Sequence, residues 1–282
     1  MNRRMSLPLC LSIAVFVFIV AIPAAPAQDS FVDRWQARAT RQQSEQPHWV
    51  TPLVTVTPRL EQEFRTDFLR QVTPARTDTW NFGNGKGLEL IPLPRVEVIF
   101  NVPPYIQHNT AAKDGFGDTT FLLKYRFFSR NEGSGNSILT AFLGGSVPTG
   151  TYKNGSVAGT ITPTLALGKG LWKFDIVSTA GAALPTSHTT ALGRPITWNT
   201  TLQANVAKYL WPEFELNDTF YKGGPNDGRV QGFATPGIML GRFHLSKAHP
   251  RLGATFGFGE QIALTHYHSY NHELVFSGRI PF

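Results

Sequence analysis

The sequence has one cysteine among its 282 residues, Cys10, and it lies in an apolar stretch near the N-terminus. A disulfide framework, a cysteine-ligated zinc site and a cysteine nucleophile are therefore excluded for the chain beyond that stretch. No second long apolar run follows, so no helical anchor is expected later in the chain. The 26 Lys and Arg residues and 19 Asp and Glu residues are scattered, and without a basic cluster no nucleic-acid partner is predicted.

Residues 1–27 are expected to form a secretory signal peptide. Arg3 and Arg4 precede an apolar run over residues 7–22, and the small residues Ala-Pro-Ala at 25–27 suit cleavage before Gln28. Because the apolar run is slightly long for a signal, an uncleaved anchor is the alternative.

The last ten residues alternate between two faces, as a β-strand does. The apolar face consists of Leu274, Phe276, Ile280 and Phe282, and the polar face of Glu273, Ser277 and Arg279. A soluble edge strand shows the same alternation, but an exported chain that ends on such a strand is typical of an outer-membrane β-barrel. The content of 26 Gly, 20 Pro and 21 Phe suits many strands, many turns and an aromatic outer band.

Alternating segments follow one another from Leu53 to the end of the chain. The predicted strands are 53–65, 79–90, 94–102, 116–128, 137–147, 160–169, 172–184, 196–209, 212–222, 229–242, 251–263 and 272–282. The alternation is clearest where Asn199, Thr201 and Gln203 face away from Trp198 and Leu202. A soluble sandwich rarely lines its inner face with Asn, Thr and Gln, so the apolar face is expected to be the outer one.

The connections between these segments alternate in length. Short links are predicted at 91–93, 170–171 and 210–211, and longer ones at 66–78, 103–115, 148–159, 185–195 and 264–271. Barrels of the outer membrane have short periplasmic turns and longer extracellular loops, so both ends of the chain are expected in the periplasm.

The sequence therefore predicts an all-β fold, a single antiparallel transmembrane β-barrel of about twelve strands and of the Gram-negative outer-membrane type. The barrel is expected over residues 51–282, after a periplasmic N-terminal segment over residues 28–50. The composition of that segment leaves three possibilities open: it is disordered, it lies in the periplasm, or it inserts into the pore as a plug.

Three motifs resemble a known family. They are Gly115-Phe-Gly-Asp-Thr-Thr-Phe-Leu-Leu-Lys-Tyr-Arg-Phe-Phe128, Gly144-Gly-Ser-Val-Pro-Thr-Gly150 and Thr162-Pro-Thr-Leu-Ala-Leu-Gly-Lys169. The family is called putative MetA-pathway of phenol degradation, and the similarity extends from about Val54 to Phe282, with its specific part at 115–170. The resemblance implies an outer-membrane barrel that moves small, often hydrophobic, molecules, and it implies no catalytic residues.

A diffusion pathway needs a lumen whose polarity selects the solute. Strand parity predicts that the lumen is lined by Arg59, Glu61, Glu63, Arg65, Arg95, Glu97, Lys124, Arg126, Asn199, Gln203, Asn205, Glu213, Glu215 and Arg279. The alternative is that these charges pair with one another and fill a narrow barrel, because a barrel of about twelve strands can be open or filled.

His266, His268 and His272 form the densest cluster of candidate metal ligands, since imidazoles two residues apart on an extended chain point the same way. No nearby carboxylate other than Glu260 and Glu273 completes a metal site, so a polar, aromatic loop is preferred and neither a metal nor another cofactor is predicted.

Ser269 next to His268 invites comparison with barrel phospholipases, but adjacent strand residues point to opposite faces. Catalysis is therefore not expected.

The predicted function is a passage for small molecules across the bacterial outer membrane, with aromatic or hydrophobic compounds as the candidate solutes. The alternatives are a structural or surface-recognition barrel with a filled lumen and, less favoured, an outer-membrane hydrolase. The expected partners are outer-membrane lipids and lipopolysaccharide, the small-molecule solute, and the barrel-assembly machinery, which would bind the C-terminal strand that ends at Phe282.

Overall fold

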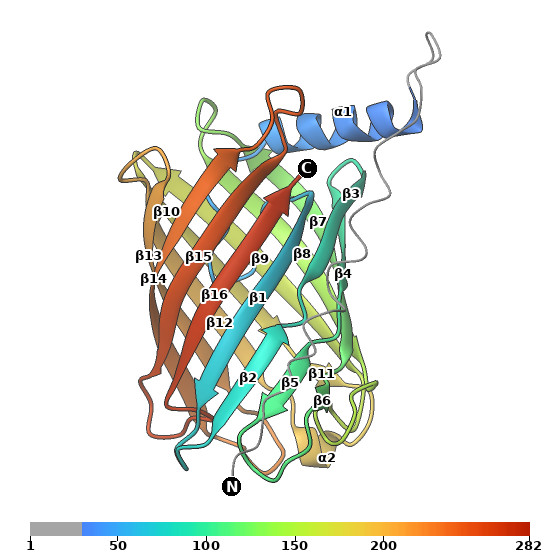
Figure 1. Ribbon diagram of the computed structural model, residues 1–282, viewed down its shortest axis with the longest axis vertical. Coiled ribbons are helices and arrows are strands. Elements are labelled where there is room, and N and C mark those ends of the chain that lie inside the picture. The colour runs from blue at the N-terminus through green and yellow to red at the C-terminus, as the bar shows by residue number, and fades with distance from the viewer. Residues whose placement is uncertain (1–29) are drawn as a thin grey trace, which may run out of the picture.

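Antiparallel strands close into a barrel in which the first strand pairs with the last (Figure 1). The computed structural model describes residues 30–282, so the predicted signal peptide lies outside the described residues. The helices are α1 (Phe31–Ser44) and α2 (Thr189–Leu192). The strands are β1 (Glu63–Val72), β2 (Asp78–Gly83), β3 (Gly87–Leu93), β4 (Val96–Asn101), β5 (Tyr105–His108), β6 (Gly115–Phe116), β7 (Thr119–Arg130), β8 (Ser137–Val147), β9 (Thr160–Leu171), β10 (Phe174–Ala182), β11 (Leu184–Pro185), β12 (Ile196–Ala204), β13 (Leu210–Phe220), β14 (Val230–His244), β15 (Gly253–Ala263) and β16 (His272–Pro281).

The sixteen strand segments form a closed barrel of twelve strands, because four of the barrel strands are each interrupted and so consist of two segments. β2 and β3 both pair with β1, and β4 and β5 continue opposite them. The closing pair of β1 and β16 runs from Glu63 opposite Pro281 to Val72 opposite His272. The predicted all-β, antiparallel barrel of about twelve strands is confirmed.

The two faces of the wall follow the alternation in the sequence. On β7 the side chain of Phe121 is 46% exposed, whereas Lys124 is 1% exposed and faces the interior. On β12, Trp198 and Leu202 are exposed, and Thr201 and Gln203 are buried. The outside of the barrel is therefore an apolar band, and the polar side chains point into the lumen.

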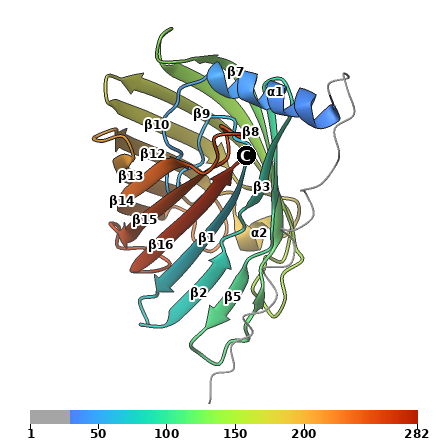
Figure 2. The same ribbon diagram turned by 45° about the horizontal axis from the view of Figure 1, so that its top comes forward.

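The barrel has two unlike ends. At one, which we call the terminal end, β1 begins, β16 ends and α1 crosses the opening (Figures 1 and 2). The turns there include 94–95, 131–136, 172–173 and 205–209. At the opposite end, the loop end, residues 148–159, 186–195 and 264–271 form long connections.

The prediction for the first strand is wrong. Residues 53–62 do not belong to the wall, and β1 occupies most of the connection predicted at 66–78, of which only residues 73–77 remain a loop. Residues 46–62, which we call the luminal segment, run inside the barrel without forming a strand, bend at residues 53–55 and 58–59, and are nearly all buried. Pro52 and Pro58 explain the difference, because proline lacks the backbone donor that a strand inside a sheet needs.

α1 holds the start of the luminal segment at the terminal end. Ser30 caps the helix by accepting a hydrogen bond from the backbone of Asp33, whose carboxylate accepts one from the backbone of Ser30. Such a reciprocal cap fixes the first turn of a helix. Among residues 30–282, neither helix has the length and apolar character to cross a membrane.

An apolar cluster fixes the middle of the luminal segment against the wall. Val50 and Leu53 pack with Leu69 of β1, Met239 of β14 and Val275 of β16. Two glycines of β15 leave room for this contact, since a Cβ atom at 257 or 259 would lie 2.7 or 2.6 Å from a methyl group of Leu53. These positions need small residues for packing, not for backbone conformation.

We expect Gly257→Val to push Leu53 out of its place and to loosen the luminal segment while the barrel still forms, at a cost of about 1–3 kcal/mol from overpacking. Hydrogen exchange over residues 46–62 should speed up, and the heat-dependent gel mobility of the folded barrel should persist. Gly278→Val is the matched control, because a Cβ atom there meets nothing closer than 3.9 Å. Equal exchange in the two variants would contradict the packing argument.

Candidate functional site in the barrel lumen

Carboxylates of the wall bind the backbone amides of the luminal segment. Glu215 accepts hydrogen bonds from the N–H groups of Val54 and Thr55, both at 2.7 Å. Glu213, two residues earlier on the same inner face of β13, accepts one from Leu53 at 3.0 Å. The adjacent amides thus find acceptors that a neighbouring strand would otherwise supply.

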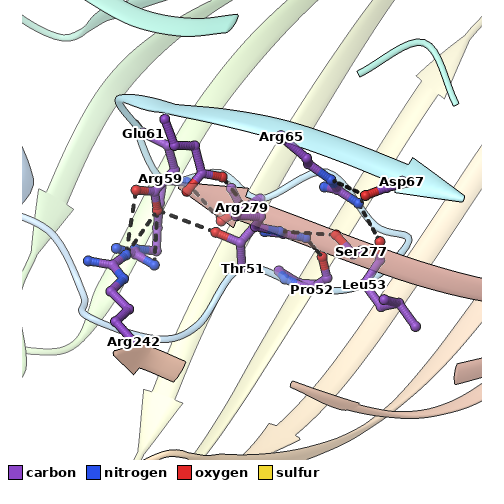
Figure 3. Close-up of polar contacts among 12 residues, drawn as sticks. Thr51, Pro52, Leu53, Arg59, Glu61, Arg65, Asp67, Arg242, Ser277 and Arg279 are labelled. Atoms are coloured by element: carbon purple, nitrogen blue, oxygen red, sulfur yellow. Dashed lines mark hydrogen bonds and ion pairs between the residues drawn. The ribbon is translucent and has the colours of Figure 1, made fainter. Parts of the chain in front are cut away.

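Cations of the wall bind the carbonyl groups of the same segment. Arg279 of β16 donates to the carbonyl of Pro52, and Arg65 of β1 donates to that of Leu53 (Figure 3). Lys124 of β7 donates to the carbonyl of Arg59 at 3.2 Å. Hydrogen bonds that involve charged groups contribute about 1.5–3 kcal/mol each, so the segment is held firmly but without a covalent bond.

Ion pairs neutralise most of these charges. Arg65 pairs with Asp67 at 2.7 Å, and Lys124 pairs with Glu97 at 2.8 Å. On the segment itself, Glu61 lies 3.0 Å from Arg59 and 3.4 Å from Arg242 of β14 (Figure 3). Buried charges are tolerated when they are paired and hydrogen-bonded in this way.

The predicted lumen-lining residues fall into four groups. Those buried on the inner face of the wall are Glu63, Arg65, Glu97, Lys124, Arg126, Gln203, Glu213, Glu215 and Arg279. Asn199 is half-buried on β12 and donates to Thr179. Arg59 and Glu61 are buried on the luminal segment, so their prediction as wall residues is wrong. Arg95 is exposed in the β3–β4 turn and Asn205 follows β12, so the prediction that they lie on lumen-lining strands is also wrong.

A cavity of about 270 Å³ remains between the luminal segment and the wall. Thr51 and Thr57 of the segment form one side of it, and Arg65, Lys86 and Glu89 lie on the other. Lys86 belongs to the short interruption between β2 and β3. The cavity combines charged, hydroxyl and apolar groups, which is the kind of lining that binds a small polar or amphipathic molecule.

The histidines of the last long loop do not come together. His268 contacts the carbonyl of Thr265 and the side chain of Asn271, at 2.8 and 3.0 Å. His272 pairs instead with Glu260 at 2.9 Å, and both belong to the outward-facing positions of their strands. Within residues 30–282, no group of three His, Cys, Asp or Glu side chains is arranged to hold a metal.

Ser269, which the sequence suggested for comparison with a nucleophile, donates its backbone N–H to Gln231. The side chain of His268 is already occupied by Thr265 and Asn271. A nucleophile and its base must share a hydrogen bond, and the described contacts of these neighbours are made elsewhere.

A polar contact ties the start of the luminal segment to the β7–β8 turn. Glu132 accepts a hydrogen bond from the N–H group of His48 at 2.6 Å, and its second oxygen lies 2.7 Å from the ring nitrogen Nδ1 of His48. Burial raises the pKa of Glu132, but the hydrogen bonds from His48 outweigh burial and lower that pKa below its ordinary value of 4.5. The contact is therefore strongest with the carboxylate ionised.

Sequence reasoning did not find the luminal segment as the partner of the wall charges. The prolines at positions 52 and 58 were the available signal, because they disfavour a central strand. It also did not find Arg242, Asp67 and Thr140; the hydroxyl of Thr140 donates to the carbonyl of Pro58 at 2.6 Å. These residues look like ordinary inward strand positions until the segment is in place.

We expect Glu215→Gln to weaken the hold on the luminal segment by about 1–3 kcal/mol, because an amide offers one acceptor oxygen where the carboxylate serves two amides. The amides of Val54 and Thr55 should exchange faster, while the strand amides of β13 keep their protection. Glu89→Gln is the control, because Glu89 is likewise buried and, among residues 30–282, forms no hydrogen bond to the luminal segment. Unchanged exchange at Val54 and Thr55 would refute the role of Glu215.

The contact of Glu132 with His48 should depend on pH. Because the pKa of Glu132 is lowered in the folded state, its stabilisation is present above the ordinary value of 4.5 and is lost as the pH falls through the lowered folded value. At neutral pH, Glu132→Gln should reduce the exchange protection of the peptide around residues 46–52 relative to the parent protein. That difference should vanish in acid, and a difference independent of pH would contradict the prediction.

The comparisons with known proteins fit this geometry. A family description, putative MetA-pathway of phenol degradation, matches residues 43–235, more than half of the chain. The structure resembles the crystal structure of the COG4313 outer membrane channel from Pseudomonas putida F1, with a TM-score of 0.56 and 15% identity over 83% of this chain and 100% of that one.

It also resembles the NanC porin, with a TM-score of 0.49 and 7% identity over 78% of this chain and 98% of that one. At these identities the likeness concerns the fold alone. A comparison with curated proteins finds no match. On the extent of the family match, the chain belongs to the family described as putative MetA-pathway of phenol degradation.

Proposed function

We propose that the protein is an outer-membrane passage for small molecules and that the luminal segment closes this passage. The observation that carries the proposal is the way in which the segment is held. Glu213, Glu215, Arg65 and Arg279 bind its backbone by hydrogen bonds, and no part of residues 46–62 is a strand of the wall. A segment bound in this way can leave the lumen while every strand pairing of the barrel remains.

The outer surface supports a membrane location. Exposed Phe, Leu, Val, Ile and Trp side chains, for example those of Phe121, Leu165 and Phe256, cover the outside of the strands, and the polar side chains point inward. Leu171 and Trp172 are exposed at the terminal end, where an aromatic residue suits the membrane border. On this basis the terminal end faces the periplasm, the loop end meets lipopolysaccharide, and the C-terminal strand ending at Phe282 is what the barrel-assembly machinery binds.

Aromatic solutes are the favoured cargo. At the loop end, the rings of Phe233 and Tyr270 stack at 4.4 Å, and those of Tyr221 and Tyr267 meet edge to face at 5.5 Å. Aromatic side chains at the loop end offer ring faces and edges that can stack with a ring-bearing solute. The family description, which names phenol degradation, points in the same direction.

The second candidate is a structural barrel with a permanently filled lumen. The burial of the luminal segment favours it, since Leu53, Leu60 and Glu61 have no exposed surface at all. The two candidates differ in a single property, which is whether the segment can leave. Neither of them requires catalysis by this chain.

Planar-bilayer conductance of the purified protein tests the proposal, with the segment either free or tied to the wall. The side chains of Thr55 and Asn217 lie 3.4 Å apart, so cysteines at both positions can be linked by a short thiol cross-linker. We expect the linked T55C/N217C protein to be silent. The same variant with reduced, unlinked thiols should show conductance steps that phenol blocks and that glucose at the same concentration does not block.

The variant E213Q/E215Q should open more often than the parent protein, because it holds the segment less tightly. Equal conductance in the linked and the reduced protein would contradict closure by the segment. Silence of the parent, the reduced and the E213Q/E215Q proteins, each with the gel mobility of a folded barrel, would favour the structural barrel. Steps that respond equally to phenol and glucose would support a passage but contradict the aromatic cargo.

A further inference from the structure

Four arginines surround a groove at the terminal end of the barrel. Arg34, Arg38 and Arg41 recur at helical spacing on α1, and Arg95 approaches from the β3–β4 turn. We call this the arginine groove; its volume is about 510 Å³, and Glu45 is the one acidic residue that lines it within the described chain. A second hollow of about 320 Å³ shares Arg95 and Glu45 and adds Arg126.

The groove is built on fixed elements. Arg38 donates to the carbonyl of Pro92 at the end of β3, and the side chain of Gln42 accepts hydrogen bonds from the backbone of Arg95 and from the guanidinium of Arg126. α1 is thereby fastened across the terminal end, with its N-terminal turns reaching past β3 (Figures 1 and 2). The helix and the turn that carry these arginines are therefore held in a fixed relation to each other, as a binding site requires.

Positive charge dominates the groove. Glu45 is shared between Arg41 at 3.1 Å and Arg126 at 3.5 Å, and among residues 30–282 neither Arg38 nor Arg95 forms an ion pair with an acidic side chain. Asp33, the other acidic residue of α1, is engaged in the helix cap with Ser30. Guanidinium groups bind phosphate oxygens in pairs, so a phosphate-bearing anion is the ligand that the groove suits best.

Apolar side chains next to the arginines point to a lipid as the source of that phosphate. On the first turn of α1, Phe31 is 64% exposed and Val32 is 61% exposed, and Leu93 at the end of β3 is 58% exposed. A helix with arginines and large apolar residues that lies across the barrel end runs parallel to a membrane surface, where such helices bind anionic lipids. A free phosphate ion would leave the exposed surface of these apolar side chains in water.

We propose that the arginine groove binds the phosphate group of an anionic phospholipid in the periplasmic leaflet of the outer membrane, with Phe31 and Val32 against its acyl chains. The proposal rests on the membrane location given above and does not depend on whether solutes pass. α1 then joins the barrel to the bilayer at the point where the luminal segment begins.

Native mass spectrometry of the protein purified from outer membranes tests this site. The probes are phosphatidylglycerol, phosphatidylcholine with the same acyl chains, and soluble glycerol 3-phosphate. We expect tighter binding of phosphatidylglycerol than of the other two. R34Q/R38Q/R41Q should lower its affinity on the order of tenfold to a hundredfold, because each cation near a lipid surface contributes roughly 1 kcal/mol.

Two matched variants control for net charge and for charge type. R76Q/K153Q/R194Q removes three exposed cations from the loop end and should leave phosphatidylglycerol binding unchanged. R34K/R38K/R41K keeps the charge and should retain most of the binding. F31S/V32S should weaken binding of phosphatidylglycerol but not of glycerol 3-phosphate.

Equal binding of phosphatidylglycerol and phosphatidylcholine, or unchanged binding by a folded R34Q/R38Q/R41Q protein, would overturn the proposal. Binding of glycerol 3-phosphate as tight as that of the lipid would also overturn it, in favour of a soluble phosphate. Absence of the parent protein from the outer-membrane fraction would count against the membrane location itself. Failure of the lipid-binding proposal can thus be told apart from failure of the membrane location.

Discussion

The luminal segment pairs with no neighbouring strand, and the rest of this structure depends on which groups form hydrogen bonds with its backbone. A buried backbone group without a hydrogen bond costs as much free energy as a lost hydrogen bond. The buried N–H and C=O groups of the luminal segment therefore need partners, and the wall supplies them. Glu213 and Glu215 supply acceptors for three successive amides, and Arg65 and Arg279 supply donors for two carbonyls. The inner wall therefore acts as a scaffold for one particular segment as well as a lining.

This role explains why the lumen carries charges of both signs. A backbone offers both donors and acceptors, so a wall that binds it needs carboxylates as well as cations. The remaining charge is then neutralised in pairs, as between Lys124 and Glu97. Outside the lumen the balance is different, because four arginines and, among the described residues, one carboxylate line the arginine groove.

The wall could be predicted from the sequence because its signal is local. Alternation on β7 and β12 separates Phe121 from Lys124 and Trp198 from Gln203 without knowledge of any partner. The candidate site could not be predicted in the same way, because many of its partners are far apart in the chain, as Val54 and Glu215 are at 161 residues. Residues 54–57 also alternate between valine and threonine, and only the prolines at 52 and 58 distinguish this stretch from a strand. The arginine groove joins a helix to a distant turn, so it too appears only in the folded chain.

The luminal segment enters and leaves the barrel at the same end. α1 precedes it there, and β1 begins there with Glu63 opposite Pro281 (Figure 1). Topologically it is a loop laid into the lumen and not a strand threaded through it. Such a loop can be withdrawn past the terminal end without the chain crossing itself and without separating β1 from β16. The fold thereby allows an occupied and an empty lumen within one unchanged wall.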